Sequence, residues 1–141
     1  MVVDTSALLA VPFAEQEAEA FARAIAGAEV PRISAANLLE AGIVADNQTD
    51  QRTGRQLDAL VANFRLRIEP VTEQQVRIAR QAYLDFGPGN HPAGLDFGDC
   101  FAYALAKATG EPLLLKGDDF EQTDVNAYRP AGSGPRSATP P

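Results

Sequence analysis

The chain has 141 residues, 45% of them hydrophobic and 22% charged, which predicts one globular domain and excludes a largely disordered protein. Nineteen acidic residues against twelve basic ones give a formal net charge of -7, which excludes nucleic-acid binding through overall positive charge. One cysteine and one histidine exclude an internal disulfide and a zinc site built from Cys and His.

Short apolar runs alternate with segments of helical periodicity in the first half of the chain. The opening run is β-branched and ends abruptly at Asp4. Ser34 stands directly before an apolar periodic segment and is the expected N-cap of a helix there. The predicted elements of this half are strands over residues 1–3 and 30–33 and helices over 14–28, 35–48 and 51–65.

The same alternation continues through the second half. Thr72 and Gln75 form a capping-box pair at the start of one helix, and Asp96 opens another that Gly110 ends. The predicted elements are strands over 66–71 and 113–116, helices over 72–86 and 96–109, and a Gly/Pro-rich loop over 87–94. Strands that alternate with helices predict an α/β fold, in which helices cover both faces of a parallel sheet.

The chain changes character near its end. Residues 129–141 are rich in Pro, Gly and Ser and contain almost no bulky apolar side chain. Such a segment buries too little surface to offset the entropy lost on ordering. We therefore predict a folded domain over residues 1–128 and a disordered tail over 129–141.

Several carboxylates lie inside apolar stretches rather than on an obvious polar surface. Asp4 and the Asp118–Asp119 pair each follow a predicted strand, at the sheet edge where open α/β folds bind ligands. Glu40 is the only charged residue between positions 35 and 45, and Asp99 lies in the first turn of an apolar helix. Simpler roles are open to each: a helix cap, a dipole partner, a buried ion pair or an ordinary turn.

A group of such carboxylates predicts a bound cation. Two carboxylates about 4 Å apart repel by about 4 kcal/mol at an effective dielectric constant of 20. Burial without a partner costs several kcal/mol more. With oxygen ligands alone, the expected ion is Mg2+, with Mn2+ as a possible substitute. Asp96 is expected to cap its helix rather than to bind metal.

Four segments, in this order, resemble the motifs of PIN-domain ribonucleases, and above all the VapC-type toxins of bacterial toxin–antitoxin pairs. They read VVDTSALLA, NLLEAGIVA, GDCFAYALAKATG and LLLKGDDF. The resemblance covers nearly the whole predicted domain. It implies a three-layer α/β/α sandwich with a small central parallel sheet.

The resemblance also implies which residues form the site. Asp4, Glu40, Asp99 and Asp119 match the family's acidic metal-binding residues, although Lys116 and Gly117 depart from the usual motif and leave Asp118 as an alternative to Asp119. Ser6 matches the family's small hydroxyl residue, which supports the site and its substrate. Beside this site, Lys116 is a candidate contact for a substrate phosphate.

The implied function is Mg2+-dependent endonucleolytic hydrolysis of RNA by the toxin of a toxin–antitoxin pair. The resemblance further implies a homodimer and a VapB-like antitoxin whose tail covers the acidic site, often with a basic residue. Because the opening segment has neither a basic leader nor a long apolar run, we expect a cytoplasmic protein without a membrane span.

Local charge allows an RNA-binding face despite the acidic total. Residues 52–80 contain six arginines against three acidic residues, a local excess of 6 − 3 = +3. Each of these arginines has the alternative role of an ordinary solvated side chain. His91 lies in the Gly/Pro loop and is interpreted as a bystander.

Two other functions remain as alternatives. A non-catalytic PIN-like module would bind metal, RNA or a protein partner without cutting. A haloacid-dehalogenase-like phosphatase also begins with a strand that ends in aspartate, but it needs a second aspartate two residues later, where this chain has Ser6.

Overall fold

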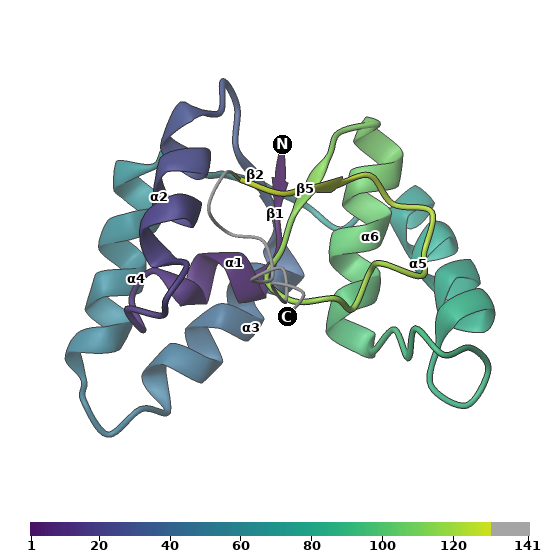
Figure 1. The fold of residues 1–141 in the computed structure, drawn as a ribbon, viewed down its shortest axis with the longest axis horizontal. Helices are drawn as coiled ribbons and strands as arrows, with labels where there is room; N and C mark the ends of the chain where they lie inside the picture. Colours follow the sequence, from purple (N-terminus) through teal and green to yellow (C-terminus); the bar gives the residue numbers. More distant parts are fainter. Residues whose placement is uncertain (131–141) are drawn as a thin grey trace, which may run out of the picture.

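Among residues 1–130, which a computed structural model of the chain describes, five short strands form one sheet. They are β1 (Val2–Val3), β2 (Arg32–Ser34), β3 (Arg67–Glu69), β4 (Leu113–Leu114) and β5 (Ala127–Tyr128). Their spatial order is β3-β2-β1-β4-β5, and every pairing is parallel (Figure 1). The predicted parallel sheet is therefore confirmed. Strand β5 was not predicted, because Ala127–Tyr128 stands between polar residues and, unlike β1 and β4, is not part of an apolar run.

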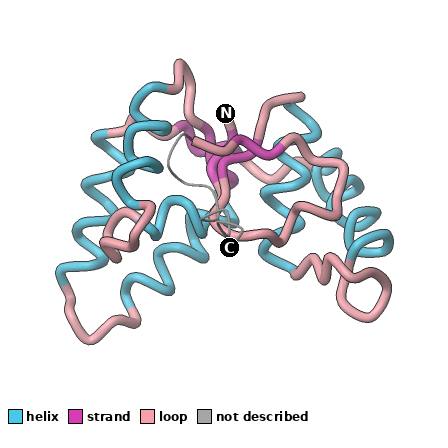
Figure 2. The backbone as a smooth tube through the Cα atoms, in the orientation of Figure 1, coloured by secondary structure: helices cyan, strands magenta, loops and turns pink. Residues whose placement is uncertain are grey.

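Helices cover both faces of this sheet. They are α1 (Thr5–Ala10), α2 (Ala18–Gly27), α3 (Ala35–Asp46), α4 (Arg52–Asn63), α5 (Glu73–Phe86) and α6 (Phe97–Thr109). Figure 1 shows α1 to α4 on one side of the strands and α5 with α6 on the other, and Figure 2 shows the strands between these two groups. This is the predicted three-layer α/β/α arrangement. No helix within residues 1–130 combines the length and apolar character needed to cross a membrane.

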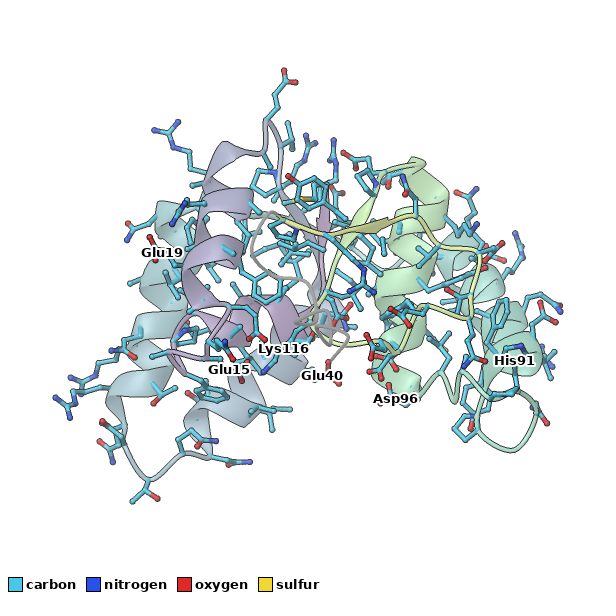
Figure 3. All side chains as sticks on the ribbon, in the orientation of Figure 1. Glu15, Glu19, Glu40, His91, Asp96 and Lys116 are labelled. Atoms are coloured by element: carbon cyan, nitrogen blue, oxygen red, sulfur yellow. The ribbon has the colours of Figure 1, made fainter. Side chains whose placement is uncertain are left out.

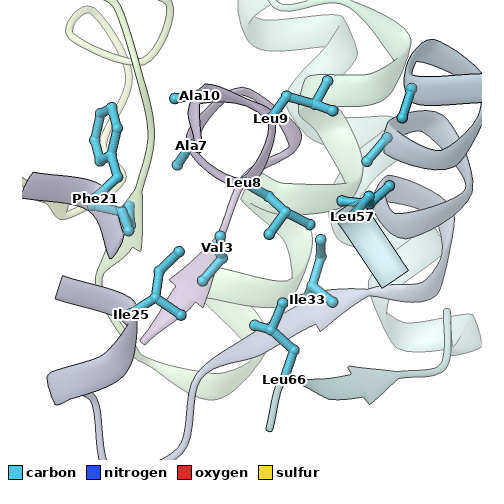
Figure 4. Packing of buried hydrophobic residues seen from close by; sticks show 13 residues of the cluster. Val3, Ala7, Leu8, Leu9, Ala10, Phe21, Ile25, Ile33, Leu57 and Leu66 are labelled. Carbon is cyan, nitrogen blue, oxygen red and sulfur yellow. The ribbon is translucent and has the colours of Figure 1, made fainter. Parts of the chain in front are cut away.

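Two hydrophobic cores lie on opposite faces of the sheet because successive strand side chains point in opposite directions. Val3 and Leu114 pack with the helices of the first group, whereas Val2 and Leu113 pack against α5 and α6. Figure 4 shows the first core, in which Phe21 and Ile25 of α2 cover β1. Each large apolar side chain buried in this way contributes about 1.5–3 kcal/mol. Because β1 and β4 are packed on both faces, the positions of the residues that follow these two strands are fixed.

Some element boundaries differ from the predictions. The helix predicted from residue 14 begins at Ala18, because Ala14 has a φ of 49°, in the left-handed region that a right-handed helix cannot include. Ser34 precedes α3, but its side chain makes no capping hydrogen bond. Gly110, with a φ of 70°, ends α6 as predicted.

The end of the predicted domain falls just after β5. Arg129, placed by prediction in the tail, forms an ion pair with Glu121 at 2.6 Å. The tail predicted over 129–141 lies outside the described residues from position 131 onward. The boundary at residue 128 stays a prediction.

Candidate active site

Strand β1 ends in Asp4, which is both buried and the N-cap of α1. Its Oδ2 atom accepts hydrogen bonds from the Ser6 backbone N–H at 3.0 Å and from the Ser6 hydroxyl at 2.5 Å. The capping role that the sequence left open for Asp4 is therefore present. Only 6% of the residue is exposed, so its carboxylate is held in one position at the carboxyl end of the strand.

Ser6 joins the ends of two neighbouring strands. Its Oγ donates to Asp4 and accepts a hydrogen bond from the backbone N–H of Lys116 at 3.0 Å. Lys116 lies two residues after the end of β4, which is paired with β1. The hydroxyl thus fixes Asp4 relative to the segment that leads to Asp118 and Asp119.

The N-terminus of α6 carries two further aspartates. Asp96 caps the helix through Oδ1, which accepts the Asp99 backbone N–H at 2.9 Å, as the sequence predicted. Asp99 completes a capping box, since its Oδ2 accepts the Asp96 backbone N–H at 3.2 Å.

Glu40 of α3 is half-buried and lies against the first turn of α6. A Cβ built at Gly98 would lie 3.0 Å from the Glu40 carboxyl carbon and would collide with its oxygens. Only glycine at position 98 permits this approach. In the view of Figure 3, Glu40 and Asp96 both lie below the strands, and His91 lies farther to the right.

Burial and mutual repulsion act on these acids together. The pKa of Asp4 is raised from 3.8 to about 6, mainly by burial and to a smaller extent by the charges of Glu40 and Asp119, against the lowering effect of the Ser6 hydrogen bonds. Burial also raises the pKa of Asp99 well above its usual range, with the charges of Asp96 and Asp4 contributing. The four predicted acidic residues therefore share one electrostatic environment.

The choice between the two C-terminal aspartates favours Asp119. Asp119 lies close enough to raise the pKa of Asp4, whereas Asp118 has an oxygen 3.9 Å from the Arg129 guanidinium. Both residues are exposed in the loop after β4. The charge of Asp119 therefore acts on Asp4, and Asp119 stays the predicted fourth acidic residue, with Asp118 as its alternative.

The four predicted carboxylates form no ion pair with a lysine or arginine of the described chain. The four are Asp4, Glu40, Asp99 and Asp119. The buried arginine partner considered for Glu40 is thus not found there. Carboxylate oxygens are donors that suit a hard divalent cation. Within residues 1–130, no group of three or more Asp, Glu, His or Cys side chains lies close enough together to hold a metal ion in the positions observed.

The ammonium group of Lys116, a candidate contact for a substrate phosphate, is already occupied by acidic side chains. Its Nζ pairs closely with Glu15, and Glu17 lies 3.9 Å away (Figure 3). Both glutamates precede α2, about a hundred residues earlier in the chain. A phosphate would have to displace these carboxylates from the ammonium group.

The arginines of the central block are also partly neutralised. Arg52 pairs with Asp50 at 3.0 Å, and Arg77 with Glu73 at 2.5 Å. Arg67 lies 3.2 Å from Glu69. These are exposed contacts that contribute little stability, so the arginines are available to exchange partners, but they do not form a bare positive face.

Sequence reasoning missed Gly98 and Asn37. The need for glycine at position 98 cannot be read from the sequence, because it arises from contact with Glu40, which is far away in the chain. Asn37 is 1% exposed although it is polar. A signal for it was present, since an amide stands in an otherwise apolar helical stretch, three residues before Glu40.

Gly98→Ala should therefore lower activity without weakening the fold. The added methyl would displace the Glu40 carboxylate, while alanine favours the helix by about 1 kcal/mol. Displacing a group that supports a metal site typically costs about 10- to 100-fold in activity. Cleavage rates and thermal unfolding of the variant measure both effects.

Gly42→Ala is the matched control for that change, because a Cβ at this position in α3 meets nothing within 4 Å. It should leave activity unchanged. Equal activity of the two alanine variants would show that the Glu40 carboxylate has no role at its observed position.

Comparisons with known proteins agree with the fold. A family model described as PIN domain matches residues 1–126. Ribonuclease VapC28 of Mycobacterium tuberculosis is 55% identical over 126 residues, which cover 89% of this chain and 95% of that protein. Ribonuclease VapC of Mycolicibacterium smegmatis is 44% identical over 127 residues, which cover 90% and 98% of the two chains.

Solved structures show the same fold at much lower sequence identity. VapC20 of Mycobacterium tuberculosis, described as a sarcin-ricin loop cleaving toxin, has a TM-score of 0.73 at 19% identity and covers 92% of this chain and 98% of its own. FitAcB of Neisseria gonorrhoeae has a TM-score of 0.64 at 19% identity, with coverage of 92% and 96%.

Proposed function

The chain belongs to the PIN domain family and is a VapC-type ribonuclease, and from this premise we propose that it hydrolyses RNA phosphodiester bonds at the acidic site around Asp4. The observation that carries the proposal is a group of carboxylates at one sheet edge, with Asp4 buried and no lysine or arginine of the described chain paired to them. Such a group requires a cation for its charged form to be stable. We propose Mg2+, which Mn2+ can replace.

Each acidic residue has a distinct place in this proposal. Asp4 and Asp99 would be the direct ligands, because Asp4 is rigidly held at the end of β1 and Asp99 faces it from α6. Glu40 and Asp119 would orient water or hold a second ion. The bound cation supplies an activated water and charge neutralisation at the scissile phosphate.

The remaining residues position these groups. Ser6 holds the Asp4 carboxylate and leaves its second oxygen for the cation. Lys116 would contact an RNA phosphate by exchanging its ion pairs with Glu15 and Glu17. The substrate is expected to be a single-stranded or looped region, where bases are accessible to side chains.

Metal dependence tests the proposed reaction. The purified protein, incubated with a structured RNA, should cut it in Mg2+ or Mn2+ and not in EDTA, and excess Mg2+ should restore cutting. Undiminished cleavage in EDTA would contradict the proposal. RNA binding without cleavage would instead support the non-catalytic module. Sequencing RNA 5′ ends after induced expression would then locate the cut.

We further propose that the protein acts in the cytoplasm as the toxin of a toxin–antitoxin pair, inhibited by a VapB-like antitoxin. The unpaired carboxylates would attract an Arg or Lys from the antitoxin tail, since a charge-assisted hydrogen bond to a carboxylate is about twice as strong as a neutral one. The antitoxin tail and the RNA substrate would then compete for binding at the acidic site.

A homodimer is proposed on an exposed apolar face. This face is formed by α3, α5 and the start of α6 and contains Leu39, Ile43, Val76, Tyr83, Leu84 and Phe97. It is hollowed by grooves of about 420 and 300 Å³ that meet at Phe97 and Phe101. The exposed side of α3 is apolar, since Leu39 and Ile43 lie on it. Contiguous apolar surface of this kind marks an interface.

Leu84→Asp should therefore shift the protein to a monomer, because it places a charge in the proposed interface. Leu84 is 58% exposed, lies on α5 and lines the groove that Phe97 and Phe101 border. Light scattering after size-exclusion chromatography measures the change. Ile68→Asp, on the edge strand β3 and 49% exposed, is the control that should leave the dimer intact. A wild-type monomer would contradict the proposed assembly.

A further inference from the structure

Asn37 is a buried polar residue that touches two of the elements carrying the acidic site. It lies on α3, and only 1% of it is exposed. Its Nδ2 donates a hydrogen bond to the backbone oxygen of Gly98 at 3.0 Å. That oxygen belongs to the peptide group that links Gly98 to Asp99, so the amide holds the backbone from which Asp99 projects.

A second contact connects Asn37 to the segment after β1. The Thr5 hydroxyl donates to the backbone oxygen of Asn37 at 3.1 Å, and Thr5 directly follows Asp4. Thr5 is itself 8% exposed, so this hydrogen bond is shielded from water. Asn37 therefore contacts the Thr5 side chain next to Asp4 through its backbone oxygen, and the backbone next to Asp99 through its side-chain amide.

Glu40 completes the arrangement. It lies three residues after Asn37, so both project from the same side of α3. The Glu40 carboxylate lies directly over Gly98, the residue whose carbonyl Asn37 holds. Rotation or sliding of α3 against α6 would break the hydrogen bond to Gly98 and move Glu40 relative to Asp99.

The amide of Asn37 is not explained by stability alone. Its Oδ1 atom is buried without a hydrogen-bond partner in the described chain, which is unfavourable for a polar atom. A leucine of similar size would avoid that cost and still fill the space. The benefit of asparagine at this position must then lie in the contact with Gly98.

Resting on the proposed function, we infer that Asn37 is a positioning residue for the acidic site. With Thr5, it fixes the relative placement of Asp4, Glu40 and Asp99. Its loss loosens that spacing and weakens cation binding while the fold remains. Residues that orient ligands in this way typically change metal affinity or activity by about 10- to 100-fold.

The experiment compares Mn2+ binding and RNA cleavage for the wild type and four variants. Asn37→Leu should bind Mn2+ about 10- to 100-fold more weakly in calorimetric titration without RNA, and its kcat should fall with little change in KM. Thr5→Val should weaken Mn2+ binding to a smaller extent, and Thr5→Ser, which keeps the hydroxyl, should restore it. A purely structural role would not predict this recovery.

Ser34→Ala is the matched control. Ser34 is fully buried on the same helix end, three residues before Asn37, and its Oγ has no hydrogen-bond partner in the described chain. It should bind Mn2+ like the wild type. If Asn37→Leu and Thr5→Val both match the wild type in Mn2+ affinity and kcat, the positioning role is refuted. If the wild type itself neither binds Mn2+ nor cuts RNA, the proposed function fails instead. Should Asn37→Leu not fold, the Thr5 pair decides the question.

Discussion

Replacing Asp99 with Asn is expected to reduce RNA cleavage at least about 1,000-fold, because a cation at this site supplies several kcal/mol of transition-state stabilisation. The amide has the same shape as the carboxylate and can keep a hydrogen bond with the Asp96 backbone, but it carries no charge for the cation. The domain should remain folded. Single-turnover cleavage assays and circular dichroism measure the two properties. Cleavage at the wild-type rate would show that Asp99 is not part of the catalytic site.

Two aspartates serve as controls for that result. Asp58→Asn, on the exposed side of α4, should retain full activity. Asp118→Asn should also be active, because Asp118 faces Arg129 rather than Asp4, whereas Asp119→Asn should be impaired. The opposite outcome for the last two variants would transfer the fourth acidic position to Asp118.

The metal-free protein is expected to lose stability as the pH rises from about 4 to 8. Burial raises the pKa of Asp4 from 3.8 to about 6 in the folded state. Between these values the folded state binds more protons than the unfolded state, so the free energy of unfolding falls with increasing pH. At about 1.4 kcal/mol for each pKa unit, Asp4 alone accounts for a loss of about 3 kcal/mol. Asp99, whose pKa is also raised, extends the decline to higher pH.

Urea unfolding in EDTA at pH 4.5, 6 and 8 measures this decline. Asp4→Asn, which cannot ionise, should flatten it, and Mg2+ should stabilise the wild type more at pH 8 than at pH 4.5. Glu111 and Asp124 have lowered pKa values, so their contributions are lost only at more acidic pH and do not mask the effect. An equal free energy of unfolding at pH 4.5 and 8 would argue against a desolvated Asp4.

Hydropathy and capping patterns were enough to predict the helices and most of the strands, because both patterns depend only on residues that are close together in the sequence. Periodicity distinguishes helices from strands, and residues such as Asp96 and Thr72 act on N–H groups only three positions away. Once strands alternate with helices, a parallel sheet follows, and its carboxyl edge is where Asp4 ends β1. The sequence thus sufficed for the fold and for naming candidate carboxylates.

Only the tertiary structure decided how those carboxylates are held. Lys116 is paired with Glu15, 101 residues away, and its backbone reaches Ser6, 110 residues away. Asn37 binds Gly98 across 61 residues. Such contacts form because packing of α3, α6 and the strands brings distant backbones together, and no local pattern encodes them. The net charge of -7 does not show where the negative charge is concentrated. The structure shows that part of it lies in the group of acidic residues around Asp4, which has no basic partner in the described chain.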